Sequence, residues 1–221
     1  MPTSYLRFSG QSLERLAALS DGIFAVAMTL LVLDLRVPLN DALHPQEALW
    51  HGGAVASESV VWHVLVDLSP QLLTYLMSFL TLGIFWMAQQ TQLGNLKGTN
   101  RDLTWIHLAF MFAVALLPFS TALLAEYITY RLALVTYWLN LLLLGVVLFA
   151  SLTYAARADL MKPDIAAAAL AASRRRILVY QMLYAVAAAA CVFNTYLSIA
   201  LIVMVQLNSA IAPRIRPLNS F

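Results

Sequence analysis

The chain has 221 residues, of which 62% are hydrophobic and 11% are charged, whereas an ordinary soluble domain has roughly 25% charged residues. Its mean hydropathy is +0.78. A soluble enzyme of this length needs a polar surface that this composition does not supply, so lipid must surround most of the chain. The formal net charge of +2 gives no reason to expect nucleic acid as a partner.

Six apolar segments predict an all-α membrane protein with six transmembrane helices in one domain, residues 1–221. Each segment is near the length of about 20 residues that crosses a bilayer as a helix. The predicted spans are about 16–35, 71–89, 103–124, 132–154, 177–193 and 196–211. A short interfacial helix is expected over 57–68. Pro163 and Asp164 predict a helix start, from which an Ala-rich run leads through Arg174–Arg176 into the fifth span.

The basic residues predict the topology. The N-terminus, the 90–102 loop, the 155–176 loop and the C-terminus fall on one side of six spans, and that side carries all but two of the 13 Lys and Arg residues. The two on the other side are Arg36 and Arg131. Such a bias marks the cytoplasmic side. We therefore expect a multi-pass protein of the plasma membrane with both termini in the cytoplasm.

The largest outer segment, residues 36–70, collects His44, His51 and His63 with four carboxylates. Histidines and carboxylates together raise the hypothesis of a metal site. Their spacing matches no zinc-ligand pattern, however. A solvated acidic loop is the favoured interpretation, and no metal or cofactor is expected in the protein.

The first span carries a heptad-like apolar stripe. On a helix with 100° per residue, one face gathers Leu19, Gly22, Ile23, Val26, Thr29, Leu30 and Leu33. One interpretation is a packing face inside a single subunit. The other is that copies of this helix surround an axis, so that rings of apolar side chains form constrictions that gate by dewetting. Thr29 would then supply the polar ring near the membrane centre, where a partly dehydrated cation could rest.

Ser20 and Asp21 place polar groups within the same span. An Asp at the centre of a membrane helix costs about 2.5–3.5 kcal/mol on insertion scales, and less near the end. Asp21 could favour the helix dipole near the N-terminus. It also points away from the stripe, so a role in fixing the first helix against its neighbours is the alternative. The candidate partners at similar depth are Gln89, Gln90 and His107.

Residues 15–31, read as Arg-Leu-Ala-Ala-Leu-Ser-Asp-Gly-Ile-Phe-Ala-Val-Ala-Met-Thr-Leu-Leu, resemble the first-helix signature of the endosomal and lysosomal potassium channel family, in its bacterial branch. The segment Phe112–Leu124 resembles the third helix of that family. Phe85-Trp86 followed by a polar pair resembles the end of its second helix. The resemblance is strong over about 60 residues, and elsewhere it rests on the number and topology of the spans.

The resemblance implies a homotetramer of six-span subunits whose first helices line a central pore that conducts K⁺ in preference to Na⁺. Val26, Leu30 and Leu33 match the hydrophobic constriction of the family, and Thr29 matches a threonine implicated in cation coordination. By the same resemblance Ser20 and Asp21, with Arg15 nearby, anchor the pore helix. The Thr-Val-Gly-Tyr-Gly carbonyl filter of other K⁺ channels is absent from the sequence, so modest selectivity is expected.

Several positions depart from the family pattern. Leu19 replaces an aromatic residue before Ser20-Asp21. Gln89 and Gln90 stand where histidines are expected, and His107 where asparagine is expected. The polar network around Asp21 is therefore expected to be rebuilt from different groups, which affects gating and pH dependence. Val26 is smaller than the usual Ile or Leu, so the narrowest ring could move to Leu30.

The sequence predicts a potassium-permeable cation channel that is not an enzyme. The alternative is a proton-coupled secondary transporter with Asp21 as carrier and His107 as relay. The six spans lack two matching halves with short, Gly/Pro-broken helices, which usually indicate a transporter site. A membrane enzyme is disfavoured because the sequence has no H-E-x-x-H, no G-x-S-x-G and no Cys pair.

Overall fold

The computed structural model describes residues 12–33, 35, 58–165 and 167–210. These residues form seven α-helices and a short 3-10 turn. The α-helices are α2 (Leu13–Leu33), α3 (Glu58–Asp67), α4 (Ser69–Gly94), α5 (Arg101–Glu126), α6 (Arg131–Arg157), α7 (Ala167–Ala189) and α8 (Thr195–Ala210), with the 3-10 turn η3 (Ala190–Val192) before α8. The fold is therefore all-α over the described residues, as the sequence predicts.

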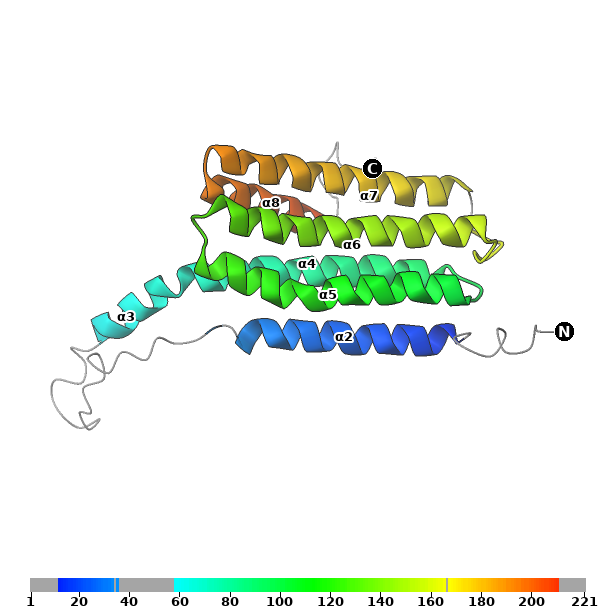
Figure 1. The fold of residues 1–221 in the computed structure, drawn as a ribbon, viewed down its shortest axis with the longest axis horizontal. Coiled ribbons are helices and arrows are strands. Elements are labelled where there is room, and N and C mark those ends of the chain that lie inside the picture. The colour runs from blue at the N-terminus through cyan, green and yellow to red at the C-terminus, as the bar shows by residue number, and fades with distance from the viewer. Residues whose placement is uncertain (1–11, 34, 36–57, 166, 211–221) are drawn as a thin grey trace.

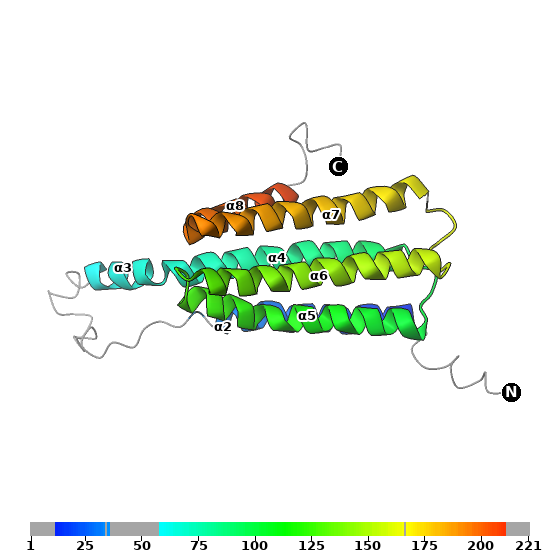
Figure 2. The same cartoon turned by 45° about the horizontal axis from the view of Figure 1, so that its top comes forward.

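The six longer helices run side by side as a bundle (Figure 1). The helix α2 lies along one edge and packs on α4 and α5, whereas α7 and α8 lie at the opposite edge, where they pack on α6 and α4. Figure 2 shows the same order after rotation. The short helix α3 projects beyond the bundle in continuation of α4. Because α2 has neighbours within the chain on one side alone, most of its surface remains uncovered.

Five of the described helices are long and apolar enough to cross a membrane, judged by length and composition: α2, α4, α5, α6 and the α7–η3 segment. The helix α8 has 16 residues, which is about 24 Å at 1.5 Å per residue and short of a hydrocarbon core of about 30 Å. The count of six spans therefore remains a prediction. Each of the six predicted segments overlaps one helix of the bundle.

One helix start differs from the prediction. The helix α7 begins at Ala167, and Pro163 and Asp164 lie in a turn before it rather than at its start. The Ala-rich run does lead through Arg174–Arg176 in one continuous helix, as expected. The helix predicted over 57–68 is present as α3. Residues 36–57 of the predicted outer segment, with His44 and His51, lie outside the described residues, and the described part holds no group of three metal-ligating side chains.

The loop between α4 and α5 is tied to the loop that follows α6. The backbone N–H of Lys97 donates to the carbonyl of Leu160 at 2.9 Å, and that of Lys162 donates to Asn95 at 2.9 Å. Asp159 accepts a hydrogen bond from the Lys97 side chain and has a φ of 53°, a left-handed conformation that Asp tolerates better than most residues. These contacts fix the end of the bundle that carries its basic residues, which we call the basic end.

Candidate pore helix and its polar anchors

The helix α2 has one buried face and one exposed face. Leu16, Ser20, Phe24, Ala27 and Leu31 are buried against α4 and α5, at the three- and four-residue spacing of a single helix face. The predicted stripe lies on the other side. Val26, Leu30 and Leu33 are 57%, 44% and 66% exposed, whereas Leu31 is 1% exposed. The stripe is therefore not a packing face inside one subunit.

Aromatic packing holds the buried face in place. The rings of Phe24 in α2 and Phe110 in α5 have centroids 6.1 Å apart, and Phe110 and Phe85 in α4 have centroids 6.3 Å apart. Both distances lie within the range of favourable aromatic pairs, worth about 0.5–1.5 kcal/mol each beyond area burial. Close packing of this kind is what joins helices in lipid, where the hydrophobic drive is weak. The three rings thus fix which side of α2 faces outward.

Thr29 lies on the exposed face, within one turn of both Val26 and Leu30. Its hydroxyl donates to the carbonyl of Val26 at 2.8 Å. A hydroxyl has a single proton and two acceptor lone pairs. Because the hydroxyl proton is used in the hydrogen bond to the helix backbone, the oxygen presents its lone pairs outward. A cation needs such electron-pair donors as ligands.

Asp21 is held by two side chains of α4. The indole Nε1–H of Trp86 donates to Oδ1 of Asp21 at 2.8 Å, and the amide of Gln90 donates to the same oxygen. The helix-dipole interpretation of Asp21 does not fit, because α2 begins at Leu13 and the dipole effect fades within the first turn. Gln90 is one of the predicted partners, whereas Gln89 and His107 bind elsewhere.

Ser20 starts a separate, buried chain of hydrogen bonds. Its hydroxyl donates to Oε1 of Gln89, whose Nε2 lies 3.5 Å from Nδ1 of His107. Nε2 of His107 lies 3.2 Å from the hydroxyl of Ser151 in α6. Because the Gln89 amide nitrogen can donate and not accept, this network assigns the proton of a neutral His107 to Nε2. The four side chains are buried, and they connect α2 to α6 through α4 and α5.

Arg15 does not reach either network. The backbone N–H of Arg15 donates to the hydroxyl of Ser12 at 3.2 Å, and Arg15 is exposed. Among the described residues its guanidinium has neither a hydrogen bond nor an ion pair. The bracing role that the family resemblance implies for Arg15 thus has no contact in the single subunit.

Sequence reasoning missed two members of these networks, Trp86 and Ser151. A signal for Trp86 was present, because residues four apart share a helix face and Trp86 lies four before Gln90. Ser151 had no comparable signal, since serine occurs in many membrane helices without a special partner.

A second buried polar cluster, also missed, lies deeper in the bundle. The hydroxyl of Tyr137 in α6 is 2.9 Å from that of Thr81 in α4, and Thr81 accepts a hydrogen bond from Gln206 of α8 at 2.7 Å. Ser78 is 2.7 Å from Thr121 of α5 and donates to Tyr137 at 3.4 Å. All five side chains are buried. The cluster therefore joins four helices and includes α8 in the same bundle.

Comparison with known proteins finds one family and several relatives that the chain resembles. Residues 15–118 match the family described as the endosomal/lysosomal potassium channel TMEM175. The chain is 36% identical over 114 residues to a Streptomyces collinus protein named as a potassium channel. It is 32% identical over 110 residues to the mouse endosomal/lysosomal proton channel TMEM175. The Streptomyces match covers 52% of the chain and 48% of that relative, so the chain matches about half the length of its bacterial relative. The mouse match covers 48% of the chain and 20% of that relative.

The fold extends the likeness beyond the matched sequence. The crystal structure of a lysosomal potassium-selective channel TMEM175 homologue from Chamaesiphon minutus superposes with a TM-score of 0.69 at 25% sequence identity. This superposition covers 90% of the chain and 96% of the solved structure. The chain thus resembles the TMEM175 family in sequence over residues 15–118, and it shares the fold of that homologue over 90% of its length.

Proposed function

We propose that the chain is one subunit of a potassium-permeable cation channel, in which α2 of each subunit lines a central pore. The observation that carries this proposal is the two-sided character of α2. One face is fixed by aromatic rings and two polar networks, and the opposite face presents the apolar stripe to the outside of the subunit.

An apolar face alone would suit lipid as well as a pore. Two features of the exposed face favour the pore. The Thr29 hydroxyl presents acceptor lone pairs within this apolar face, which lipid cannot use and a cation can. Rings of Val26, Leu30 and Leu33 would form apolar constrictions that exclude hydrated ions unless the pore is wetted. Selection between K⁺ and Na⁺ would then depend on partial dehydration, and it should be modest.

The polar anchors give this helix a fixed rotation. Ser20 and Asp21 are neighbours on α2, and each binds one of the neighbours Gln89 and Gln90 on α4. A rotation of α2 about its axis would break both contacts at once. The anchors therefore keep Val26, Thr29 and Leu30 turned toward the proposed pore axis.

Assembly and topology are part of the proposal. The resemblance of residues 15–31 supports a homotetramer, and the exposed stripe supplies the surface that four copies would place around the axis. The distribution of Lys and Arg supports six spans in a plasma membrane with both termini in the cytoplasm. The protein would act in the lipid bilayer with K⁺ as the permeant ion and without a cofactor.

A proton-coupled transporter is the competing function. It would need Asp21 as carrier and His107 as relay, yet these residues belong to different networks among the described side chains. Asp21 contacts Trp86 and Gln90, whereas His107 contacts Gln89 and Ser151. The arrangement thus favours an anchoring role for Asp21 over proton transfer.

Recording from the purified full chain in planar bilayers, with K⁺ on one side and Na⁺ on the other, tests the proposal. Unitary steps with a reversal potential shifted toward the K⁺ equilibrium value are expected. Slow electroneutral flux that follows a pH gradient, without unitary current, would establish the transporter instead.

A further inference from the structure

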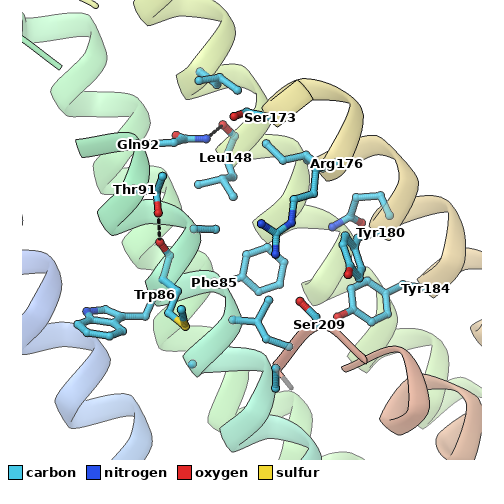
Figure 3. Close-up of a pocket in the computed structure, with 18 of the residues that line it drawn as sticks. Phe85, Trp86, Thr91, Gln92, Leu148, Ser173, Arg176, Tyr180, Tyr184 and Ser209 are labelled. Atoms are coloured by element: carbon cyan, nitrogen blue, oxygen red, sulfur yellow. Dashed lines mark hydrogen bonds between the residues drawn. The ribbon is translucent and has the colours of Figure 1, made fainter. Parts of the chain in front are cut away.

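A cavity of about 420 Å³ opens between α4, α6, α7 and α8, away from the exposed face of α2 (Figure 3). Within the described residues α8 has 16 residues and α7 has 23. The helix α8 ends at Ala210, and its last residues, Ser209 and Ala210, form part of the wall. Beyond them α8 no longer runs beside the basic half of α7 within the described residues. The volume is within the range of about 300–1000 Å³ that holds a small organic ligand.

The lining changes from polar to apolar along the bundle. Toward the basic end the wall includes Thr91, Gln92, Asn95 and Ser173, whereas further along α4 it includes Leu80, Gly83 and Ile84. Polar groups at the membrane surface and apolar walls at greater depth are the arrangement that an amphiphile requires. A soluble ion would make no favourable contact with the apolar half of the cavity.

Arg176 supplies the charge of the cavity. Figure 3 shows its side chain reaching from α7 into the space between Phe85 and Ser209, and its Cζ lies 5.8 Å from the ring centroid of Tyr180. Among the described residues Arg176 has neither a hydrogen bond nor an ion pair, and none of those that line the cavity is acidic. The guanidinium therefore presents its donors to whatever enters.

Gln92 adds an unpaired acceptor. Its Nε2 donates to the carbonyl of Leu148 at 3.1 Å, and its Oε1 is buried without a partner among the described residues. Gln92 is 8% exposed, so water reaches it poorly. A buried acceptor of this kind is costly unless a ligand supplies a donor. A hydroxyl on the ligand would satisfy it.

We propose that this cavity binds an anionic phospholipid with a hydroxyl-bearing headgroup, such as phosphatidylglycerol. The phosphate pairs with Arg176, a headgroup hydroxyl donates to Gln92, and one acyl chain lies against Gly83 and Ile84. Basic pockets between membrane helices on the cytoplasmic side are known sites for anionic headgroups. The segment after Ala210 is a poorer occupant, because it carries Arg214 and Arg216 and has the same charge sign as Arg176. The proposal does not depend on ion conduction.

The test is lipid binding to the full chain in mild detergent, measured by native mass spectrometry. Phosphatidylglycerol and phosphatidylcholine with identical acyl chains are the probes. The wild type should retain phosphatidylglycerol at least about tenfold more tightly, since a hydrogen bond to a charged group is worth about that factor. Arg176→Gln should lose this preference. Arg175→Gln, which removes the same charge one residue away and outside the cavity lining, should keep it.

The acyl-chain contact is tested at Gly83. A Cβ built at Gly83 meets no atom within 4 Å, so Gly83→Ala should fold and bind as the wild type does. Gly83→Leu fills the apolar half and should weaken both phospholipids by a similar factor while Arg176 remains. Equal binding by Gly83→Leu and Gly83→Ala would overturn the placement of the chain.

Three further results would overturn the proposal. The first is equal retention of both phospholipids by the wild type. The second is displacement of phosphatidylglycerol by millimolar inorganic phosphate, which would make the cavity a site for a free anion. The third is stronger lipid binding after deletion of residues 211–221, which would show that the tail is the natural occupant. No competition by phosphate and no gain on deletion are the results that support the lipid.

Discussion

Trp86 donates its indole N–H to the carboxylate of Asp21 across 2.8 Å, and this contact joins α4 to the middle of α2. Gln90, one turn further along α4, donates to the same oxygen. A carboxylate inside a membrane helix is costly unless it is paired. The two donors therefore explain how α2 carries Asp21, and they make the docking of α2 dependent on it.

Trp86→Phe should weaken this docking by about 1 kcal/mol, because it removes one donor and keeps Gln90. The expected result is a lower yield of the proposed tetramer and a lower melting temperature in detergent, measured by size exclusion and thermal unfolding. Asp21→Ala should lower the tetramer yield further, and more than it alters permeation. The control is Trp105→Phe at an exposed position of α5. Intact tetramers with altered ion selectivity would instead place Asp21 in the conduction path.

Ser20→Ala should destabilise the protein by about 1–3 kcal/mol, because it leaves Oε1 of the buried Gln89 without its donor. Gln89→Leu should cost a similar amount. The double variant should lose less free energy of unfolding than the sum of the two single losses, by about 0.5–3 kcal/mol, because both substitutions remove the same hydrogen bond. Denaturation in detergent measures the free energies of unfolding. The hydroxyl of Ser173 binds the backbone of its own helix, so the effects of Ser173→Ala and Gln89→Leu on the free energy of unfolding should add. Non-additivity of this control pair would mean that the Ser20–Gln89 comparison does not measure their contact.

Tyr137→Phe should also lower stability by about 1–3 kcal/mol. The substitution removes the hydroxyl that Thr81 and Ser78 share in the buried cluster. Thermal unfolding compares it with Tyr127→Phe, which alters an exposed ring and should change little. An equal loss in both variants would mean that the cluster contributes nothing specific.

Leu30→Ala should widen the proposed constriction and raise either the unitary conductance or the permeability to Na⁺. The physical reason is that a smaller apolar ring lowers the cost of admitting a hydrated ion. Bilayer recording measures both quantities, with Leu143→Ala on an exposed face of α6 as the control. Unchanged currents in Leu30→Ala would mean that this residue lines nothing.

The stripe of α2 could be predicted from the sequence as one helix face, because its period alone groups Val26, Thr29, Leu30 and Leu33, but the period left open whether that face lies inside the subunit or outside it. The polar partners could be predicted in part. Depth in the membrane indicated that Gln89 and Gln90 lie near Ser20 and Asp21. The assignment of each partner depends on the rotation of α4 about its axis, which hydropathy does not encode. Adjacent residues on a helix point 100° apart, so the two glutamines could have bound in either order.

Other features could not be predicted for physical reasons. The start of α7 at Ala167 is one of them, because Pro163 and Asp164 favour a helix start and instead form a turn, although the continuity of the helix through Arg174–Arg176 was predicted. The lining of the cavity comes from four separate helices. How four helices pack against one another does not appear as a hydrophobic period in the sequence of any one of them.

The measurement that tests the central claim most directly is cysteine accessibility during K⁺ current. The native Cys191 is buried and would be replaced by Ala as background. A membrane-impermeant methanethiosulfonate cation should then block current through Leu30→Cys. It should leave Val146→Cys, at an exposed position of α6, and the background protein unaffected. Block at Val146 with none at Leu30 would contradict a pore lined by α2, and so would the absence of any K⁺ current.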